Sequence, residues 1–198
     1  RASSEYFMKN FIAISGPSGT GKTTLCRELQ RKKQEIDFSV SCTTRRQRYT
    51  EEDGVDYHFI SMEEFEEKVN KNEFMEYEEV HGDYYGTMKK PLEDAIRGDR
   101  LLLLEVDVKG AKSIQSLYPK NTVTIFILPP NLDDLRKRLR SRGTDSEKRI
   151  KKRMDRLELE LKEKDWFDYH VINNQIEHAS NELIKIIEKQ TEGVLYES

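Results

Sequence analysis

Continuously apolar runs alternate with helix-like stretches along the whole 198-residue chain, and we find no repeat and no low-complexity tract. Such runs favour strands that helices cover on both faces, because a half-exposed strand would alternate apolar and polar residues. The pattern therefore predicts an α/β fold with a central parallel sheet. The expected strands are Phe11–Ser15, Phe38–Cys42, Leu101–Asp107, Thr122–Leu128 and Tyr169–Asn173.

Capping signals place helices between these strands. Ser61 with Glu64, and Thr144 with Glu147, have the spacing of a capping box, so helices are predicted to begin just after Ser61 and Thr144. Further helices are expected at Lys22, Asp107, Asn131 and Glu177. Between residues 43 and 89 the alternation breaks, and short, partly polar strand patterns surround a glutamate-rich helix. We interpret this region as an inserted flap and not as a second domain.

Composition narrows the class of protein. The 34 basic and 37 acidic residues give a net charge of −3, and 36% of residues are charged, which is typical of a soluble protein. No apolar run approaches the roughly 20 residues of a membrane helix, and the first residues lack the apolar core of a signal peptide. We therefore expect a cytoplasmic location, no membrane or nucleic-acid partner, a monomer or small homo-oligomer, and free thiols at Cys26 and Cys42.

The stretch "GPSGTGKTT" (residues 16–24) matches the phosphate-loop pattern G-x-x-x-x-G-K-[ST] in full. An apolar strand precedes it and a helical pattern follows, which is the context that a true match requires. Successive N–H groups and a helix N-terminus would face the phosphates, Lys22 would add a positive charge, and the Thr23 hydroxyl could ligate Mg²⁺. The predicted triphosphate-binding residues are Gly16, Pro17, Ser18, Gly19, Thr20, Gly21, Lys22, Thr23 and Thr24. The pattern does not choose the reaction.

A second anion site is suggested where the second predicted strand runs into the flap. Arg45, Arg46 and Arg48 place three guanidinium groups within four residues, and guanidinium groups suit bidentate contacts with phosphate. Tyr57 and Tyr85 could add phenolic donors. A solvated turn is the alternative for this cluster, since charge runs usually face solvent.

Glu76 differs from the other glutamates of the flap, which we interpret as a solvated helix face. Alternation in "EFMEYEEV" puts Phe74, Glu76 and Glu78 on one side of a strand. A carboxylate beside bound phosphate would be repelled, so Glu76 is expected at the other end of a ligand. Guanine presents two adjacent N–H donors to such a carboxylate, whereas adenine does not.

Two features of the second half complete the pattern. Asp107 ends an apolar strand, at the sheet edge where ligands and metals collect. Residues 131–156 contain eleven Lys or Arg and five Asp or Glu, a local excess of 11 − 5 = +6. A solvated face and a nucleic-acid patch are the alternatives, but a lid that closes over phosphates is favoured beside a phosphate loop.

Six ordered blocks together resemble the guanylate kinase family. They are "GPSGTGKTT", "SVSCTTRRQR", "DGVDYHF", "EFMEYEEVHGDYYGT", "EVDVKG" and "RLRSRGT". The resemblance implies a P-loop NTPase fold of three layers, α/β/α, and transfer of the γ-phosphoryl group of ATP to GMP, giving ADP and GDP with Mg²⁺. It also implies a core of residues 8–42, 90–136 and 160–198, a GMP-binding flap of residues 43–89 and a helical lid of residues 137–159.

The same resemblance implies residue roles. The GMP site would comprise Ser41, Glu76 and Thr87 around the guanine, with Arg45, Arg48, Tyr57, Tyr85 and Gly86 around the phosphate. Asp107 would lie near GMP, the transferred phosphoryl and Mg²⁺, which Thr23 would also ligate. Arg138, Arg142 and Arg153 would reach ATP from the lid, and Asn173 would lie near the adenine. The catalytic group would be Lys22, Asp107, Arg138 and Arg153.

Departures from the family's commonest pattern occur at Arg46, Gln47, Lys109 and Asn174, and none removes an expected ligand. Two rival hypotheses remain. A noncatalytic guanylate-kinase-like module that binds peptides would typically have a degraded phosphate loop, whereas the loop of this chain is intact. Another nucleoside or nucleotide kinase would share the loop but would not need Ser41, Glu76 and Thr87 together.

Overall fold

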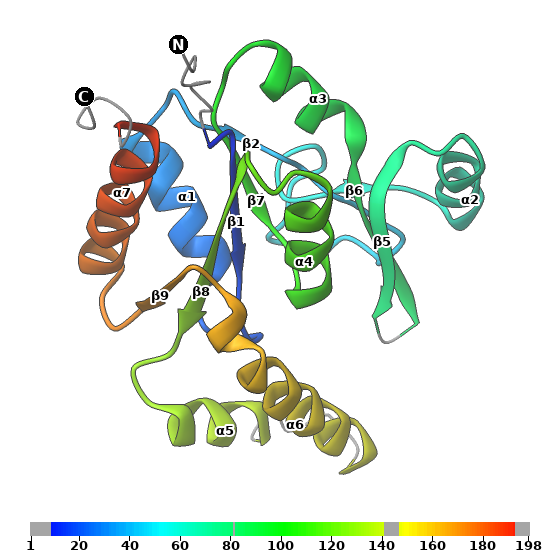
Figure 1. The fold of residues 1–198 in the computed structure, drawn as a ribbon. Helices are drawn as coiled ribbons and strands as arrows, with labels where there is room; N and C mark the ends of the chain where they lie inside the picture. Colours follow the sequence, from blue (N-terminus) through cyan, green and yellow to red (C-terminus); the bar gives the residue numbers. More distant parts are fainter. Residues whose placement is uncertain (1–8, 81, 141–146, 193–198) are drawn as a thin grey trace.

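The computed structural model describes residues 9–80, 82–140 and 147–192, and Figure 1 shows two sheets with flanking helices. The larger sheet is parallel throughout, with strand order β2-β7-β1-β8-β9. Its strands are β1 (Phe11–Ser15), β2 (Asp37–Phe38), β7 (Leu102–Glu105), β8 (Thr122–Leu128) and β9 (Tyr169–Ile172). The predicted α/β fold with a central parallel sheet is confirmed.

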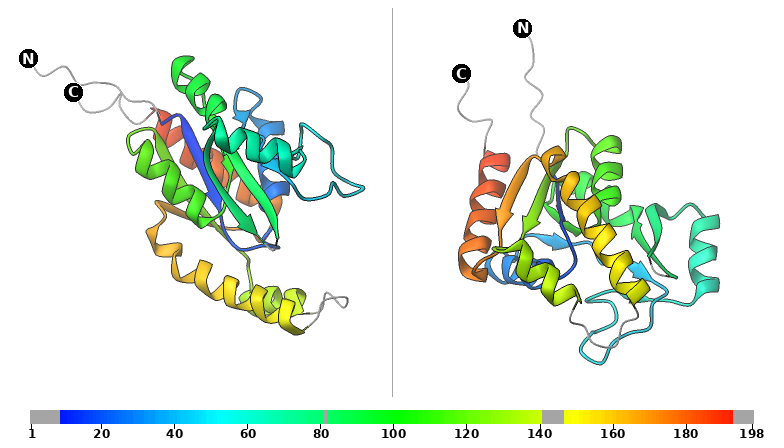
Figure 2. Two further views of the ribbon diagram at one scale, coloured as in Figure 1. Left: turned by 90° about the vertical axis from the view of Figure 1, so that its right-hand side faces the viewer. Right: turned by 90° about the horizontal axis from the view of Figure 1, so that it is seen from below.

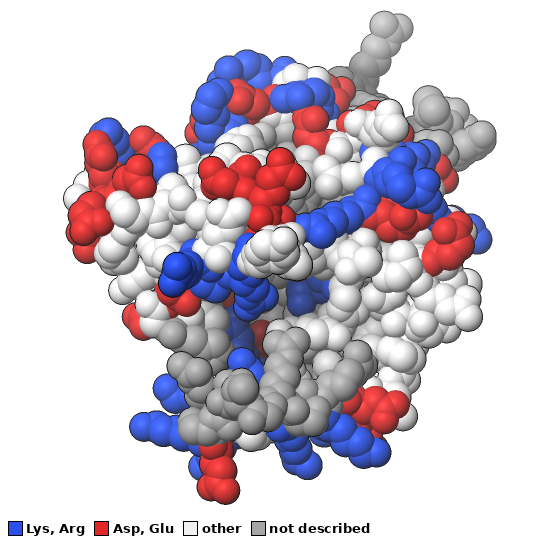
Figure 3. All heavy atoms as spheres, turned by 180° about the vertical axis from the view of Figure 1, so that it is seen from behind, with Lys and Arg blue, Asp and Glu red and all other residues white. Residues whose placement is uncertain are grey.

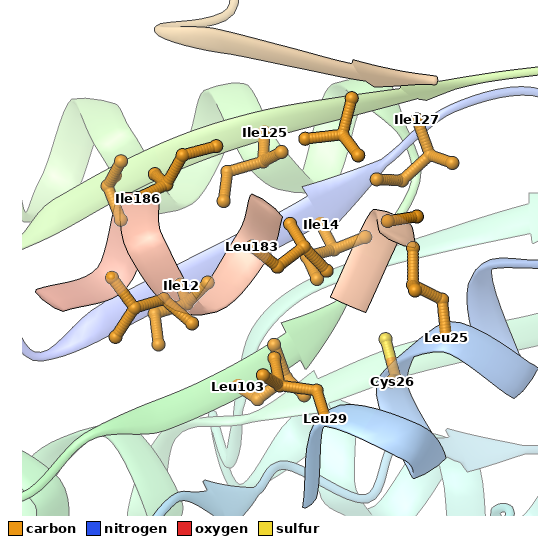
Figure 4. Packing of buried hydrophobic residues seen from close by; sticks show 14 of the residues in the cluster. Ile12, Ile14, Leu25, Cys26, Leu29, Leu103, Ile125, Ile127, Leu183 and Ile186 are labelled. Atoms are coloured by element: carbon orange, nitrogen blue, oxygen red, sulfur yellow. The ribbon is translucent and has the colours of Figure 1, made fainter. Parts of the chain in front are cut away.

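Helices cover both faces of this sheet, which explains why its strands are continuously apolar. On one face, α1 (Lys22–Lys32) and α7 (Ile176–Glu192) bury Ile12 and Ile14 together with residues of β7 and β8 (Figure 4). On the other, α3 (Lys89–Arg97) and α4 (Val108–Leu117) cover Phe11 and Ala13. Successive residues of β1 thus pack into the hydrophobic cores on opposite faces of the sheet, as the pleat of a strand requires.

The inserted flap is a separate sheet with strand order β4-β3-β6-β5, set beside the larger sheet (Figures 1 and 2). We use the name flap for β3 (Cys42–Thr43), β4 (His58–Phe59), α2 (Met62–Asn70), β5 (Phe74–Val80) and β6 (Asp83–Met88). The capping box is present at α2: Glu64 N–H donates to Ser61 Oγ, and Ser61 N–H donates to Glu64 Oε2. The predicted short strands and helix are therefore confirmed.

Two helices, α5 (Leu132–Arg140) and α6 (Glu147–Lys162), form a pair below the carboxyl ends of β1 and β8 in Figure 1. Leu135, Leu139 and Leu157 pack between them. Asn131 Oδ1 caps α5 by accepting the N–H groups of its first turn. The helix predicted after Thr144 is α6, although Thr144 lies outside the described residues. A short 3₁₀ turn, η1 (Lys164–Trp166), connects α6 to β9.

Several predicted elements differ from the structure. The run Phe38–Cys42 serves two sheets, because Phe38 pairs with β7 whereas Cys42 pairs within the flap. The strand predicted to reach Asp107 ends at Glu105, because Asp107 is the N-cap of α4 and its Oδ1 accepts the Gly110 N–H at 2.7 Å. Helix α3 was not predicted; its proline, Pro91, lies in the first turn, where no intrahelical N–H bond is lost.

The predicted alternation of β5 is wrong at its start. A register shift between Phe74 and Glu76 interrupts the β5–β6 ladder. Phe74 consequently stacks on Phe65 of α2, on the side where Tyr77 also lies, whereas Met75 packs against the core beneath α4. Such a bulge places two successive residues on one face. It turns Glu76 away from the flap's aromatic cluster and toward α4.

Both cysteines are free, as predicted, and both are buried. Burial raises the pKa of the Cys42 thiol to about 11 and that of Cys26 well above its usual range. Both therefore remain thiols near neutral pH. Each described helix is too short or too polar to span a lipid bilayer.

Candidate active site

A cavity of about 550 Å³ opens between the loop after β1, the flap and helix α6. Most of the predicted site residues line it: Gly16, Pro17, Ser18, Gly19, Gly21, Lys22, Thr23, Thr24, Ser41, Arg48, Tyr57, Glu76, Tyr85, Gly86, Thr87, Asp107 and Arg153. The structure thus brings together two sequence motifs that lie far apart in the chain. One end of the cavity is the phosphate loop, and the other is the flap.

The phosphate loop joins β1 to α1 and takes a shape that depends on two glycines. Gly16 has φ +139°, and Gly21, the residue before α1, has φ +82°. A Cβ at Gly16 would collide with the Ile127 carbonyl of β8, and one at Gly21 would lie 2.7 Å from Asn173 Nδ2. Side chains would therefore be strained and crowded at both positions. The sequence signature here reflects local backbone geometry.

Lys22 is half-buried at the start of α1. Its Nζ donates to the carbonyl oxygens of Gly16 at 2.6 Å and Pro17 at 2.9 Å. Burial lowers the pKa of Lys22, and the nearby carboxylates of Glu105 and Glu160 oppose that shift. The Lys22 ammonium group is held by carbonyl oxygens of its own loop, so it can turn toward an incoming phosphate. A charged phosphate oxygen is a stronger hydrogen-bond partner than a carbonyl oxygen.

The hydroxyl of Thr23 points across the loop toward β7. Thr23 Oγ1 donates to Glu105 Oε1 at 2.9 Å. Hydroxyl and carboxylate oxygens are the ligands that Mg²⁺ prefers. Among the described residues, no three His, Cys, Asp or Glu side chains converge to hold a metal unaided.

Aromatic and basic side chains of the flap surround the far end of the cavity. The rings of Tyr57 and Tyr85 meet edge to face at 5.9 Å, and burial is the main cause that raises the pKa of Tyr57 to about 12. Its phenol is therefore a hydrogen-bond donor at neutral pH. Arg48 lines the cavity. Arg45 does not; its guanidinium covers the Tyr57 and Phe59 rings and bonds Glu51 Oε1 at 2.7 Å.

Glu76 lies in the cavity beside Thr87, its partner across the β5–β6 ladder. Thr87 Oγ1 donates to Glu76 Oε1 at 2.6 Å, and Thr87 is almost fully buried. Burial raises the pKa of Glu76, and the hydrogen bond from Thr87 partly opposes this effect. Ser41, which precedes β3, contributes a further hydroxyl. The three side chains offer two acceptors and a donor, which is the pattern needed for a guanine edge.

Four charged cavity residues were given no role from sequence: Glu78, Glu105, Arg156 and Glu160. Arg156 Nε donates to Glu160 Oε1 at 2.9 Å, and its Nη2 lies 3.4 Å from Asp107 Oδ2. Helical spacing was an available signal, since residues 153, 156, 157 and 160 share one face of α6. Glu105 was recognisable as a carboxylate inside an otherwise apolar strand.

The carboxyl of Glu78 lies against Asp107, at the junction of flap, core and α6. Burial and this neighbouring carboxyl raise the pKa of Glu78 to about 7, while Arg156 and Lys109 oppose the shift. Glu78 Oε1 also lies 3.6 Å from Lys109 Nζ. Glu78 therefore carries a proton in part of the population at neutral pH.

Stability should accordingly depend on pH through Glu78. A folded-state pKa above the unfolded value stabilises the fold fully below about pH 4.5, and this contribution is lost as pH rises through about 7. Glu78→Gln, which cannot ionise, should therefore gain stability relative to wild type between pH 5.5 and 8.5, by about 1 kcal/mol after solvent screening. Urea unfolding at the two pH values measures this. Glu79→Gln, on the opposite face of β5, is the control; an equal gain there would contradict the prediction.

The remaining predicted residues were expected at the donor side. Arg153 of α6 lines the cavity, whereas Arg142 and the side chain of Arg138 lie outside the described part of the structure. Thr20 and Asn173 are placed behind the loop: Asn173 Nδ2 donates to the Thr20 carbonyl at 2.8 Å. Asn173 thus braces the phosphate loop from the end of β9.

Surface charge is mixed on the described part of the face in Figure 3, where basic and acidic side chains are interspersed.

A parallel α/β sheet, a phosphate loop between β1 and α1, and a second polar pocket facing that loop define a P-loop NTPase fold suited to phosphoryl transfer. The guanylate kinase family model matches residues 8–190. The chain belongs to the guanylate kinase family.

Curated relatives cover most of the chain. The guanylate kinase of Carboxydothermus hydrogenoformans is 43% identical over 176 residues, covering 89% of this chain and 86% of its own length. That of Fusobacterium nucleatum is 45% identical, covering 88% of this chain and 94% of its own length. The crystal structure of guanylate kinase from Anaplasma phagocytophilum superimposes with a TM-score of 0.78 at 28% identity, covering 94% of this chain and 88% of that one. The predicted family is therefore confirmed.

Proposed function

We propose that this chain transfers the γ-phosphoryl group of ATP to GMP, giving ADP and GDP. The main observation in support of this proposal is a single cavity whose two ends are lined by different kinds of residue. The phosphate loop with Lys22 forms the donor end, and the flap adds a carboxylate–hydroxyl pair, Glu76 and Thr87, on the acceptor side. Relatives named guanylate kinase at 43–45% identity support the same reaction.

In this proposal the flap holds GMP at both ends. Glu76 accepts hydrogen bonds from the two adjacent N–H donors of guanine, and Ser41 and Thr87 complete the contact with the base. Arg48, with the phenols of Tyr57 and Tyr85, binds the phosphate. Gly86 lines the same pocket, and Arg45 acts by packing on the Tyr57 ring.

The donor residues of the proposal are those of the loop. Backbone N–H groups of residues 16–24 and the N-terminus of α1 cradle the phosphates of ATP. Lys22 follows the transferred phosphoryl and stabilises its developing charge, and Arg153, with Arg138 and Arg142, adds charge from the α5–α6 side. Asn173 keeps the loop in shape, and its amide lies on the side proposed for the adenine.

No general base is needed, because the GMP phosphate is already an adequate nucleophile. The protein positions two anionic substrates in line and neutralises their charge. Mg²⁺ supplies charge neutralisation on the phosphates when bound. Thr23 would hold it, with Asp107 as the proposed carboxylate and Glu105 adjoining Thr23. The cytoplasmic location, the small oligomeric state and the lack of a nucleic-acid partner stay predictions.

The noncatalytic peptide-binding alternative is not favoured, because the loop, its lysine and the acceptor pocket are all in place.

A coupled ADP-release assay with GMP, dGMP, AMP, UMP and dTMP as acceptors tests the function. We expect turnover with GMP, and a kcat/KM for AMP roughly 1,000-fold or more lower, because adenine leaves the half-buried Glu76 carboxylate without its donors. ADP release without an acceptor is the control for ATP hydrolysis. Absence of GMP-dependent turnover would overturn the proposal, and equal use of AMP would overturn the role of Glu76.

A further inference from the structure

An ion pair connects the phosphate-loop helix to the flap. Arg27 of α1 contacts the carboxylate of Asp56, which lies in the loop before β4. Arg27 is four residues beyond Thr23, so the two side chains lie along the same side of the helix. The side chain of Asp56 is only 7% exposed, whereas that of Arg27 is 57% exposed. A solvent-accessible cation thus reaches into the flap to meet a nearly buried anion.

Asp56 is built firmly into its loop. Its Oδ2 accepts the Glu52 N–H at 2.7 Å, and its own N–H donates to the Glu52 carbonyl at 3.0 Å. The next residue is Tyr57, whose carbonyl accepts the Gly54 N–H at 2.8 Å. Because these bonds close a compact turn, a displacement of Asp56 moves the backbone of Tyr57.

Tyr57 in turn belongs to the wall of the cavity. Its ring meets those of Phe59 and Tyr85 and lies under the guanidinium of Arg45. Arg27 thus contacts Asp56, and the next residue in the chain, Tyr57, lines the acceptor pocket. On the far side of the flap, β5 packs on α4 through Met75. The ion pair fixes the side of the flap that faces α1.

We propose that Arg27 and Asp56 are a positioning pair that holds the acceptor-pocket residue Tyr57 at a set place relative to the phosphate-loop helix. The inference rests on the proposed function, since it assigns Tyr57 to the GMP phosphate. An exposed ion pair would contribute little, but Asp56 is almost excluded from water and loses its cation when Arg27 is shortened. The expected consequence is a weaker acceptor site with an intact donor site.

Arg27→Ala tests this pair, with Arg31→Ala as the matched control. Arg31 lies one turn further along α1 and pairs with Glu28 of the same helix, and no polar contact joins it to the described residues of the flap. In steady-state assays we expect Arg27→Ala to raise the KM for GMP about 5- to 10-fold, with the KM for ATP and the thermal midpoint near those of Arg31→Ala. Arg27→Lys should recover most of the loss.

A double-mutant cycle separates the pair from other effects of Arg27. Asp56→Asn keeps an oxygen for the Glu52 N–H but removes the charge, so Arg27→Ala/Asp56→Asn should bind GMP no worse than Arg27→Ala alone. A KM for GMP within twofold of the Arg31→Ala value, equal changes for ATP and GMP, or additive single effects would each overturn the pair. Wild-type turnover in the same assay tests the proposed function separately; wild-type turnover without the Arg27 effect would leave that function standing and remove the pair.

Discussion

Replacing Lys22 by alanine is expected to lower kcat with GMP by roughly 1,000-fold while the affinity for GMP stays near that of wild type. Lys22 lies at the donor end, where its ammonium group contacts the Gly16 and Pro17 carbonyls and is desolvated. An electrostatic contact in such a partly desolvated position strengthens as charge moves in the transition state. The acceptor pocket is built from the flap and does not depend on this side chain.

Calorimetric titration of GMP and single-turnover kinetics with ATP separate the two effects. Lys71→Ala, in an exposed position at the end of α2, controls for the loss of one positive charge. If Lys22→Ala weakened GMP binding as much as it slowed turnover, Lys22 would be a general binding residue and not the group that follows the phosphoryl. A normal kcat would remove it from the catalytic group.

Replacing Glu76 by alanine should abolish most of the preference for guanine and leave the fold intact. We expect the ratio of kcat/KM for GMP over AMP to fall roughly 100-fold, since a charged acceptor for two N–H donors is lost. Thr87 keeps its place in the β5–β6 ladder but loses the partner of its hydroxyl. Glu76→Gln should retain the volume and one acceptor, and should fall between Glu76→Ala and wild type.

The measurement is the acceptor panel repeated on each variant, together with circular dichroism. Glu79→Ala is the matched control, because Glu79 lies three residues further along β5 with its side chain exposed. An unchanged preference in Glu76→Ala would mean that the base is read elsewhere in the cavity.

A feature of the site could be predicted from sequence when the residues that determine it lie close together in the chain. The phosphate loop could be read directly, because its glycines, lysine and hydroxyl lie within nine residues and their roles follow from backbone geometry. Glu76 could be singled out by its strand and by electrostatic argument. The bulge that turns it toward α4 could not, because it is a shift in the pairing register of β5 with β6, and the period of side chains along β5 alone does not show it.

The contacts missed from sequence are those between distant segments. Glu105 meets Thr23 across 82 positions, and Arg156 reaches Asp107 across 49. A one-dimensional pattern shows that α6 has a polar face, but not which strand that face meets. Likewise, the apolar run Phe38–Cys42 does not reveal that its two ends join different sheets.

The bracing of the phosphate loop by β8 and β9 has a consequence for the order of assembly. The loop precedes both strands in the chain, yet Gly16 packs on the Ile127 backbone, and Thr20 is held by Asn173, 153 positions later. A nascent chain on the ribosome therefore emerges with its loop sequence complete but with the supports for it still untranslated. The loop can therefore bind a nucleotide only after β9 has joined the sheet. A chain truncated before β9 would contain the phosphate-loop motif but not a formed nucleotide site.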